Sequence, residues 1–354
     1  MTLELVRVDS LRCLNDVEVG LHPERNYLYG ANGAGKTSFL EALYLLSRGR
    51  SFRTRQTKRL VQRGSTAMLV YGEIRGASGA RGRIGVRVDH EGLAISIDRE
   101  AVGLAELAAA LRVEVVDPSV HRLIEGGPSE RRRFLDWGVF HVEHEFLQAW
   151  RRYRRVLSQR NAALKGGGKA PALRVWDEAF LEEAAHVSAA RARYAVGFAS
   201  LVATVSRQLI GAPLLVEYYP GWRQGSDLAD ALAGSLPRDL QYGATQVGPH
   251  RADLRLEFAG EPIAERASRG QQKMAAAALV IAQARTLAGA GQGGLLLVDD
   301  PAAELDQDAL GRLMAAVLDT PAQKVFTGLT EAQLAPAAGF PVFHVEQGRV
   351  EQVV

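Results

Sequence analysis

Residues 30–37 read Gly-Ala-Asn-Gly-Ala-Gly-Lys-Thr, which is a complete phosphate-binding loop pattern. In such a loop, glycines let successive backbone N–H groups turn toward phosphate oxygens without a Cβ in the way. The flanks fit the same unit, because 26–29 reads as a short buried strand and 38–46 has the apolar spacing of a helix. The N-terminus of that helix would point at the phosphates. The stretch therefore predicts a site for a nucleoside triphosphate.

The loop supplies backbone groups and two side chains with distinct tasks. Lys36 can reach the β- and γ-phosphates and is expected to act in catalysis, while the Thr37 hydroxyl can bind Mg²⁺. The residues expected to bind the nucleotide here are Gly30, Ala31, Asn32, Gly33, Ala34, Gly35, Lys36, Thr37 and Ser38.

A second half of the site is predicted far along the chain, where the apolar run 295–298 ends on two acids. Asp299 is placed to hold Mg²⁺ directly or through water, and Asp300 could polarise an attacking water. Two acids at a strand end could instead cap the next segment or face solvent, but the phosphate-binding loop favours the catalytic interpretation. Most of the chain separates Lys36 from Asp299, which favours an ATPase head interrupted by an inserted arm.

A third feature precedes the apolar helix expected over 271–288. Ser268 and Gly270 stand just ahead of its N-terminus, where a hydroxyl, backbone N–H groups and the helix dipole together attract an anion. By itself such a pattern is usually a plain helix cap. Its position shortly before the acidic strand makes it more specific.

Hydrophobic periodicity divides the chain into a β-rich part, a helical part and a second alternating part. Strands are expected in the first part at 2–8, 17–21, 67–75, 83–88 and 93–98. Helical spacing holds over 129–164 and again from 173 to about 209, with a glycine-rich break at 165–171, and its aromatic stripe is expected to be core. Strands and helices alternate after 243, at 254–258, 271–288, 294–300, 307–318 and 323–327.

This pattern predicts an α/β fold: a P-loop ATPase head with a β-rich lobe and an inserted α-helical arm domain. The head would comprise 1–125 and 243–354, and the arm 126–242.

Composition sets the cellular context. The chain has 354 residues, a net charge of +3 and a single cysteine, Cys13, which excludes an internal disulfide and a Cys-ligated metal site. No leader peptide and no run of apolar residues long enough to span a membrane is recognisable. We therefore expect a cytoplasmic protein without a membrane partner.

The order of these motifs resembles the ABC-type ATPases of the SMC branch, and most closely the RecF family. The matches run from the first strand almost to the C-terminus, and the supporting stretches are 51–53, 118–137, 248–253, 268–272 and 299–306.

The resemblance implies a monomer that dimerises head-to-tail when ATP and Mg²⁺ bind. The loop 30–37 of one subunit would hold the nucleotide, and three residues of the other would cover its γ-phosphate: Ser268, Gly270 and Gln271. Glu304 and Asp306 would lie in a loop that crosses the dimer interface. Hydrolysis would be weak, DNA-stimulated and used as a switch.

One departure from the family pattern concerns the acid that usually follows Pro118. This chain has Ser119 there, so coupling between nucleotide and arm depends on whether Asp117 replaces the acid.

Nucleic acid is the expected partner. Basic clusters occur at 48–59, 131–133 and 151–155, and they are either solvated faces or sequence-independent contacts to a phosphate backbone. The resemblance implies duplex DNA near a single-strand gap or junction, the partners RecR and RecO, and a role in loading RecA during recombinational repair and replication restart.

Three alternatives use similar heads. A transporter ATPase subunit would have a compact helical lobe in place of the long arm. An ATPase attached to a nuclease would need a metal-binding nuclease domain, and a structural SMC-like bridge would need a much longer coiled coil. Length and motif order favour the DNA-binding ATPase.

Overall fold

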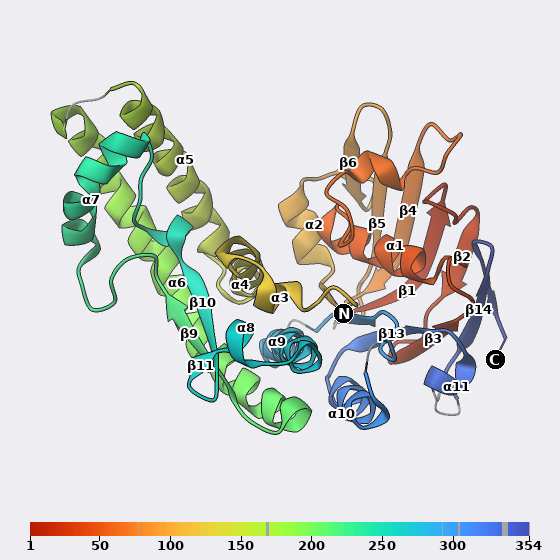
Figure 1. Ribbon diagram of the computed structural model, residues 1–354. Helices are drawn as coiled ribbons and strands as arrows, with labels where there is room; N and C mark the ends of the chain where they lie inside the picture. Colours follow the sequence, from red (N-terminus) through yellow and green to blue (C-terminus); the bar gives the residue numbers. More distant parts are fainter. Residues whose placement is uncertain (77, 168–169, 292, 304, 335–338, 354) are drawn as a thin grey trace. The chain divides into compact units, whose positions relative to one another are not determined.

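The computed structural model describes the chain except for residues 77, 168–169, 292, 304, 335–338 and 354. The chain divides into two compact units (Figure 1). Unit 1 comprises Met1–Val120 and Leu287–Val354, and unit 2 comprises His121–Thr286.

Unit 1 contains an antiparallel sheet with the strand order β2-β1-β4-β5-β6-β7. Its strands are β1 (Thr2–Asp9), β2 (Val17–Gly20), β4 (Met68–Arg75), β5 (Arg81–Val88), β6 (Leu93–Ile97) and β7 (Glu100–Ala101). Along β4 and β5 buried and more exposed residues alternate, as expected for a sheet with one face in the core. The five strands predicted in this part are thus confirmed to within about two residues at their ends.

The second sheet of unit 1 is mainly parallel and has the order β15-β14-β3-β13-β12-β8. Its strands are β3 (Arg25–Tyr29), β8 (Val113–Val116), β12 (Leu295–Val298), β13 (Gln323–Gly328), β14 (Val342–Glu346) and β15 (Arg349–Gln352). All residues of β12 and β13 are buried, which explains why β12 has a continuous rather than an alternating apolar pattern.

Helix α1 (Lys36–Arg48) lies between the two sheets, because it packs against β4 and β5 on one side and β8 and β13 on the other. Eleven of its thirteen residues are buried. The short elements of this unit are α2 (Leu104–Ala110), η1 (Thr57–Leu60), α10 (Gln307–Leu318) and α11 (Glu331–Leu334). The phosphate-binding loop is therefore fixed between β3 and a helix that is enclosed by the core.

Unit 2 is built around α6 (Ala170–Ile210), a helix of 41 residues. Helices α5 (Phe146–Lys165) and α4 (Pro128–Val142) pack against α6, as does strand β9 of a short sheet of the order β11-β10-β9. The remaining elements are α3 (Arg122–Glu125), β9 (Leu214–Tyr219), α7 (Leu228–Tyr242), η2 (Pro249–Arg251), β10 (Asp253–Phe258), β11 (Glu261–Pro262), α8 (Ile263–Arg266) and α9 (Arg269–Gly289), whose last three residues belong to unit 1. None of the described helices combines the length and apolar character that crossing a membrane requires.

Two expectations differ from the structure. The helical stretch predicted over 129–164 is two helices, because the chain leaves the helix at Glu143 and re-enters it at Phe146. The second unit boundary falls at Thr286, whereas the predicted arm ended at residue 242. Residues 243–286 group with unit 2 because β10 pairs along its full length with β9. Part of the predicted glycine-rich break, 168–169, lies outside the described residues.

Candidate nucleotide site

The phosphate-binding loop has the backbone conformation that its glycines predict. Gly33 and Gly35 have φ angles of 80° and 123°, in the region of backbone conformation that residues other than glycine rarely adopt. At Gly35 a Cβ would lie 3.1 Å from the Cys13 Sγ atom, and at Gly30 it would lie 2.2 Å from the carbonyl oxygen of Val345. Glycine is thus required both by conformation and by close neighbours.

Lys36 turns back onto the loop that precedes it. Its Nζ atom donates hydrogen bonds to the carbonyl oxygens of Gly30 at 2.6 Å and of Ala31 at 2.9 Å. Burial lowers the pKa of the Lys36 ammonium, and the nearby carboxylates of Asp300 and Asp299 oppose that shift. The charged group is therefore held at the centre of the loop, close to the acids at the end of β12.

Thr37 and Asp299 meet as the sequence predicts. The Thr37 Oγ1 atom lies 3.1 Å from Oδ1 and 3.0 Å from Oδ2 of Asp299. A third residue, Thr327 at the end of β13, donates its hydroxyl to Asp299 Oδ1 at 2.7 Å. Sequence reasoning missed Thr327, although its position at the carboxyl end of the neighbouring parallel strand was a usable signal, because such ends meet at one edge of a sheet.

The carboxyl of Asp299 is buried and lies near other acids. Burial raises its pKa, the hydroxyls of Thr327 and Thr37 lower it, and the charges of Asp117 and Asp300 raise it further. Ser119 donates its hydroxyl to Asp117 Oδ2 at 2.6 Å. Asp117 is thus close enough to Asp299 to influence its charge, and Ser119 fixes its orientation.

Asp300 is held by its backbone. Its amide donates to the Thr327 hydroxyl at 3.0 Å, and its φ of 44° is unusual for a residue other than glycine. Thr327 therefore contacts both acids and sets their relative positions.

These residues fit a magnesium ion. A threonine hydroxyl and a carboxylate are the oxygen ligands that Mg²⁺ prefers, and such sites are completed by phosphate oxygens and water. Among the described residues no group of three or more His, Cys, Asp or Glu side chains could hold a metal by itself. A site completed by the nucleotide is consistent with that finding.

The motif before the apolar helix forms a reciprocal cap at the N-terminus of α9. The Ser268 amide donates to Gln271 Oε1 at 3.0 Å, and the Gln271 amide donates to Ser268 Oγ at 3.3 Å. Residues 268–271 are all exposed, and open space surrounds the position that a Cβ of Gly270 would take. The predicted anion site is thus a capped and accessible helix start.

Comparison with known proteins agrees with these features. The family model described as the RecF/RecN/SMC N-terminal domain matches residues 2–350. A protein of Pseudomonas putida named DNA replication and repair protein RecF is 40% identical over 365 residues, covering 99% of this chain and 98% of that protein. The chain belongs to the RecF family. A protein of the same name from Pseudomonas paraeruginosa is also 40% identical, with the same coverage.

Solved structures support the same assignment. A structure of the recombination mediator protein RecF with ATP in the RecFOR pathway has a TM-score of 0.89 and 26% identity, and covers 100% of this chain and 98% of that chain. An SMC head bound to the winged-helix domain of ScpA has a TM-score of 0.61 at 15% identity over 100% of this chain and 97% of that chain, which shows the fold alone. The predicted ABC/SMC-type head fold is therefore confirmed.

The loop before α10 contains the two acids that the RecF resemblance places at a dimer interface. Asp306 caps α10, since its carboxylate accepts from the Ala309 amide at 2.7 Å. Glu304 lies outside the described residues.

The basic residues considered as DNA contacts prove to be of two kinds. Arg48 has a side chain that is only 12% exposed, lies 3.7 Å from Glu114 and packs over Tyr44, so it is not a surface contact. Arg131 binds both carboxylate oxygens of Asp253 at 2.8 Å and is also structural. The exposed residues are Arg50, Arg53, Arg55, Lys58, Arg59, Arg133, Arg151, Arg152, Arg154 and Arg155.

The stretch 248–253, one of the RecF-like motifs, holds unit 2 together. Arg132 donates to the carbonyl oxygen of Ala252 at 2.7 Å, and Arg191 donates to that of Pro249 at 2.7 Å while binding Asp136. The motif therefore has a structural role inside this unit.

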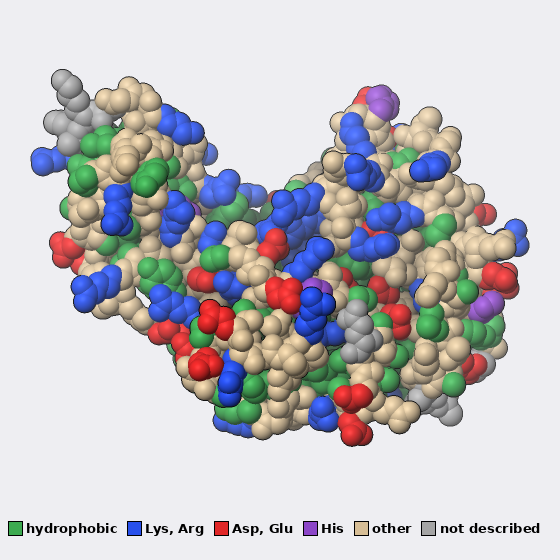
Figure 2. Space-filling view, viewed as in Figure 1, with side chains coloured by type: hydrophobic (Ala, Val, Ile, Leu, Met, Phe, Trp, Pro, Cys, Tyr) green, Lys and Arg blue, Asp and Glu red, His purple; other side chains and the backbone are tan. Residues whose placement is uncertain are grey.

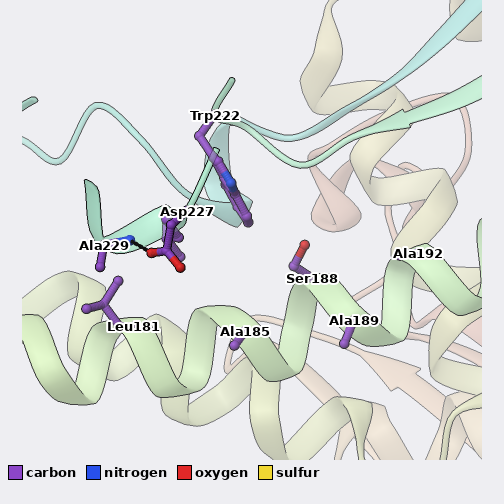
Figure 3. Close-up of a pocket in the computed structure, with 9 residues that line it drawn as sticks. Leu181, Ala185, Ser188, Ala189, Ala192, Trp222, Asp227 and Ala229 are labelled. Atoms are coloured by element: carbon purple, nitrogen blue, oxygen red, sulfur yellow. Dashed lines mark hydrogen bonds between the residues drawn. The ribbon is translucent and has the colours of Figure 1, made fainter. Parts of the chain in front are cut away.

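Unit 2 also has a concave site of about 390 Å³ between α6 and the start of α7 (Figure 3). Figure 3 shows the Trp222 ring opposite Ser188 and the small side chains of α6. Its one acid, Asp227, accepts a hydrogen bond from the Ala229 amide at 2.6 Å and so serves as the cap of α7. The lining is mostly apolar and includes neither lysine nor arginine.

Proposed function

We propose that this protein is an ATP-dependent DNA-binding protein of recombinational repair and replication restart. ATP and Mg²⁺ bind at residues 30–38 and Asp299 and drive a head-to-tail homodimer. That dimer binds duplex DNA near single-strand gaps and helps RecO and RecR to load RecA. Slow hydrolysis of ATP, stimulated by DNA, then releases the dimer from the DNA.

The observation that supports this proposal is that one chain contains both a phosphate-binding loop and an exposed, capped helix start, which we interpret as two half-sites. The first is the loop with the Thr37–Asp299 contact in unit 1. The second is the exposed cap formed by Ser268 and Gln271 at the N-terminus of α9. A head-to-tail pair of chains would complete two equal sites, each from one half of each chain.

The second half-site suits a γ-phosphate. Ser268 offers a hydroxyl, and the first turn of α9 carries the positive end of the helix dipole. Gly270 lets a phosphate approach the backbone, because no side chain covers it. A bound triphosphate would then hold two subunits together, and its hydrolysis would weaken the contact.

The chemistry of hydrolysis needs few protein groups, because phosphoryl transfer depends mainly on positioning and charge. Lys36 would neutralise charge on the transferred phosphoryl group, Thr37 and Asp299 would hold the metal, and Asp300 would orient the attacking water. Asp117, held by Ser119, acts on the charge of Asp299 and would sense the metal end of the site.

The roles proposed for DNA and for the partner proteins are inferred from relatives of this chain. The RecF relatives are named for DNA replication and repair, and the similar solved structure is described as a mediator in the RecFOR pathway. The exposed arginines and lysine of unit 1 and α5 provide the charge that backbone binding needs.

Sedimentation velocity with Mg·ATP, with and without a labelled gapped duplex, tests the proposal. We expect a monomer without nucleotide, a dimer with Mg·ATP, and co-sedimentation of that dimer with the duplex. Lys36→Ala is the matched control and should stay monomeric. A wild-type protein that remains monomeric with ATP and does not co-sediment with the duplex would overturn the proposal. That result would favour an ATPase subunit of some other assembly.

A further inference from the structure

An unusually basic stretch follows helix α1. Between Glu41 and Glu73 the sequence has no acid, but it has seven basic residues: Arg48, Arg50, Arg53, Arg55, Lys58, Arg59 and Arg63. All except Arg48 are exposed. Figure 2 shows several Lys and Arg side chains over the part of unit 1 in which Figure 1 places α1 and α2. Such a surface attracts a polyanion.

The acid before this stretch is fully enclosed. Glu41 is 0% exposed and lies on α1, one helical turn beyond the magnesium-site residue Thr37. Positions four apart on a helix lie on the same face, so the two side chains are neighbours along α1. A carboxylate this deeply buried requires charged or hydrogen-bonding partners.

Three groups bind the Glu41 carboxylate. Arg12 is held at both oxygens, with Nη2 at 2.9 Å from Oε1 and Nε close to Oε2. Ser51 donates its hydroxyl to Oε1. Arg53 is the loosest partner, with its Nη1 atom 3.4 Å from Oε2.

The charges in this cluster do not balance, because one carboxylate faces two guanidinium groups. Arg12 is 27% exposed and makes one hydrogen bond and a second close ion-pair contact to Glu41, whereas Arg53 is 47% exposed and makes a single long contact. A phosphate could therefore take Arg53 while Arg12 still pairs the buried carboxylate. Arg53 is the partner that can be exchanged.

The same cluster fixes the start of the basic stretch and a loop beside the nucleotide. The Ser51 hydroxyl also accepts from the amides of Arg53 and Thr54, at 2.8 and 3.1 Å. The Arg12 amide donates to the carbonyl oxygen of Leu60 at 2.7 Å. Cys13, the next residue, lies against Gly35 of the phosphate-binding loop. A displacement of the basic stretch would thus be transmitted to the phosphate-binding loop in two ways, through Ser51 and Glu41 on α1 and through Arg12 and Cys13.

We propose that residues 50–63 contact the phosphate backbone of duplex DNA, and that Glu41, through Arg53 and Ser51, transmits this contact to helix α1 and the nucleotide site. This inference rests on the proposed function. Glu41 is a positioning residue, since it touches neither nucleotide nor DNA. The consequence is that DNA stimulation of hydrolysis depends on both Arg53 and Glu41, whereas of these two residues only Arg53 contributes to DNA affinity.

Three variants test this with the full-length protein: Arg53→Ala, Glu41→Gln and the control Arg7→Ala. Arg7 is an exposed arginine of the same unit, paired with exposed Glu18 and outside the basic stretch. Each variant is measured for hydrolysis with and without duplex, for duplex affinity across salt concentrations, and for binding of a fluorescent ATP analogue.

For Arg53→Ala we expect about 5-fold less stimulation by duplex, and a salt dependence of log affinity that is shallower by about 0.9. For Glu41→Gln we expect duplex affinity to be kept, because Arg53 is released toward DNA, while stimulation falls to a similar extent. Analogue binding should be unchanged in both, and Arg7→Ala should behave as wild type. A merely structural role of Glu41 would lower affinity and stimulation together. If Glu41→Gln does not fold, Ser51→Ala removes one transmitting contact and keeps the carboxylate.

Wild-type stimulation and salt dependence in Arg53→Ala, beside a wild-type protein that duplex does stimulate, would overturn this inference alone. A wild-type protein that duplex neither binds nor stimulates would overturn the proposed function as well. Equal stimulation by polyglutamate and by duplex would overturn the assignment to nucleic acid.

Discussion

The hydroxyl of Thr37 lies 3.0 Å from Oδ2 of Asp299, although 262 positions separate the two residues in the sequence. The parallel sheet explains this contact. Thr37 follows β3 and Asp299 follows β12, and β13 lies between these strands, so both residues stand at the same sheet edge. The insertion of unit 2 between them leaves the geometry of this edge intact.

Thr327 should matter for magnesium although it is not expected to bind the ion itself. Thr327→Val removes the hydroxyl that positions Asp299. We therefore expect about 10- to 100-fold weaker binding of Mg²⁺, so that hydrolysis needs a correspondingly higher Mg²⁺ concentration. A magnesium titration of the hydrolysis rate measures this. Thr320→Val is the control, since its buried hydroxyl donates to the Ala316 carbonyl oxygen. Equal effects of the two variants would contradict the assigned role.

Asp300→Asn should trap the nucleotide-bound dimer. The amide keeps the shape of the side chain but cannot act as the carboxylate that orients water, so binding continues while hydrolysis stops. We expect a long-lived dimer in Mg·ATP by size-exclusion chromatography. If this variant stays monomeric with ATP, the role given to Asp300 is wrong.

The ion cluster around Arg160 should control the stability of unit 2. Arg160 is 1% exposed and donates to Asp177 at 2.9 Å and to Asp239 at 2.7 Å. Arg160→Ala leaves two acids without their cation, and we expect a loss of about 3–5 kcal/mol in the free energy of unfolding of this unit.

Tryptophan fluorescence in urea can measure this, because all four tryptophans lie in unit 2: Trp137, Trp150, Trp176 and Trp222. Arg155→Ala, at an exposed position of the same helix, should change stability by at most about 0.5 kcal/mol. Indistinguishable transitions for the two variants would refute the prediction.

Unit 2 should lose stability in mild acid through His250. Its Nε2 atom lies 2.8 Å from the Thr245 carbonyl oxygen and so carries the proton, while Nδ1 accepts from the Tyr153 hydroxyl at 2.6 Å. Burial lowers the pKa of His250 to about 4, below its usual 6.5. Between these values the unfolded chain binds more protons, so stability falls as pH drops from about 6.5 to about 4, by about 3 kcal/mol.

Urea transitions followed by tryptophan fluorescence at several pH values test this. His250→Gln should flatten the pH dependence over this range, and His144→Gln, at an exposed position, should not. A steep acid dependence that persists in His250→Gln would show that other groups are responsible.

Much of the fold follows from the sequence because its signals are local. The loop 30–37, the strand before Asp299 and the helix 307–318 each combine a motif with regular spacing, and the structure places them as predicted. Strand β8 (Val113–Val116) was not predicted, because four residues between two loops carry too little periodicity. The role of Arg48 was also hidden, since only the fold brings Glu114 to it.

The site was predictable to the extent that motifs name its residues. Thr37 and Asp299 belong to recognised patterns, whereas Thr327 belongs to none and acts through strand order alone. The role of Glu41 could not be predicted from the sequence, for a related reason. An acid in a helix is ordinarily a solvent-facing residue, and only its burial and its partners reveal the cluster.

The most direct test of the central claim, a nucleotide site shared between two copies, is a mixing experiment. Ser268→Arg and Lys36→Ala should each be monomeric with Mg·ATP in sedimentation velocity, the first because it blocks the covering half-site and the second because it cannot bind nucleotide. A mixture of equal amounts should form a dimer, because the intact loop of one chain meets the intact Ser268 motif of the other. A mixture that stays monomeric while wild type dimerises, or a Ser268→Arg chain that no longer binds ATP by itself, would contradict the shared site.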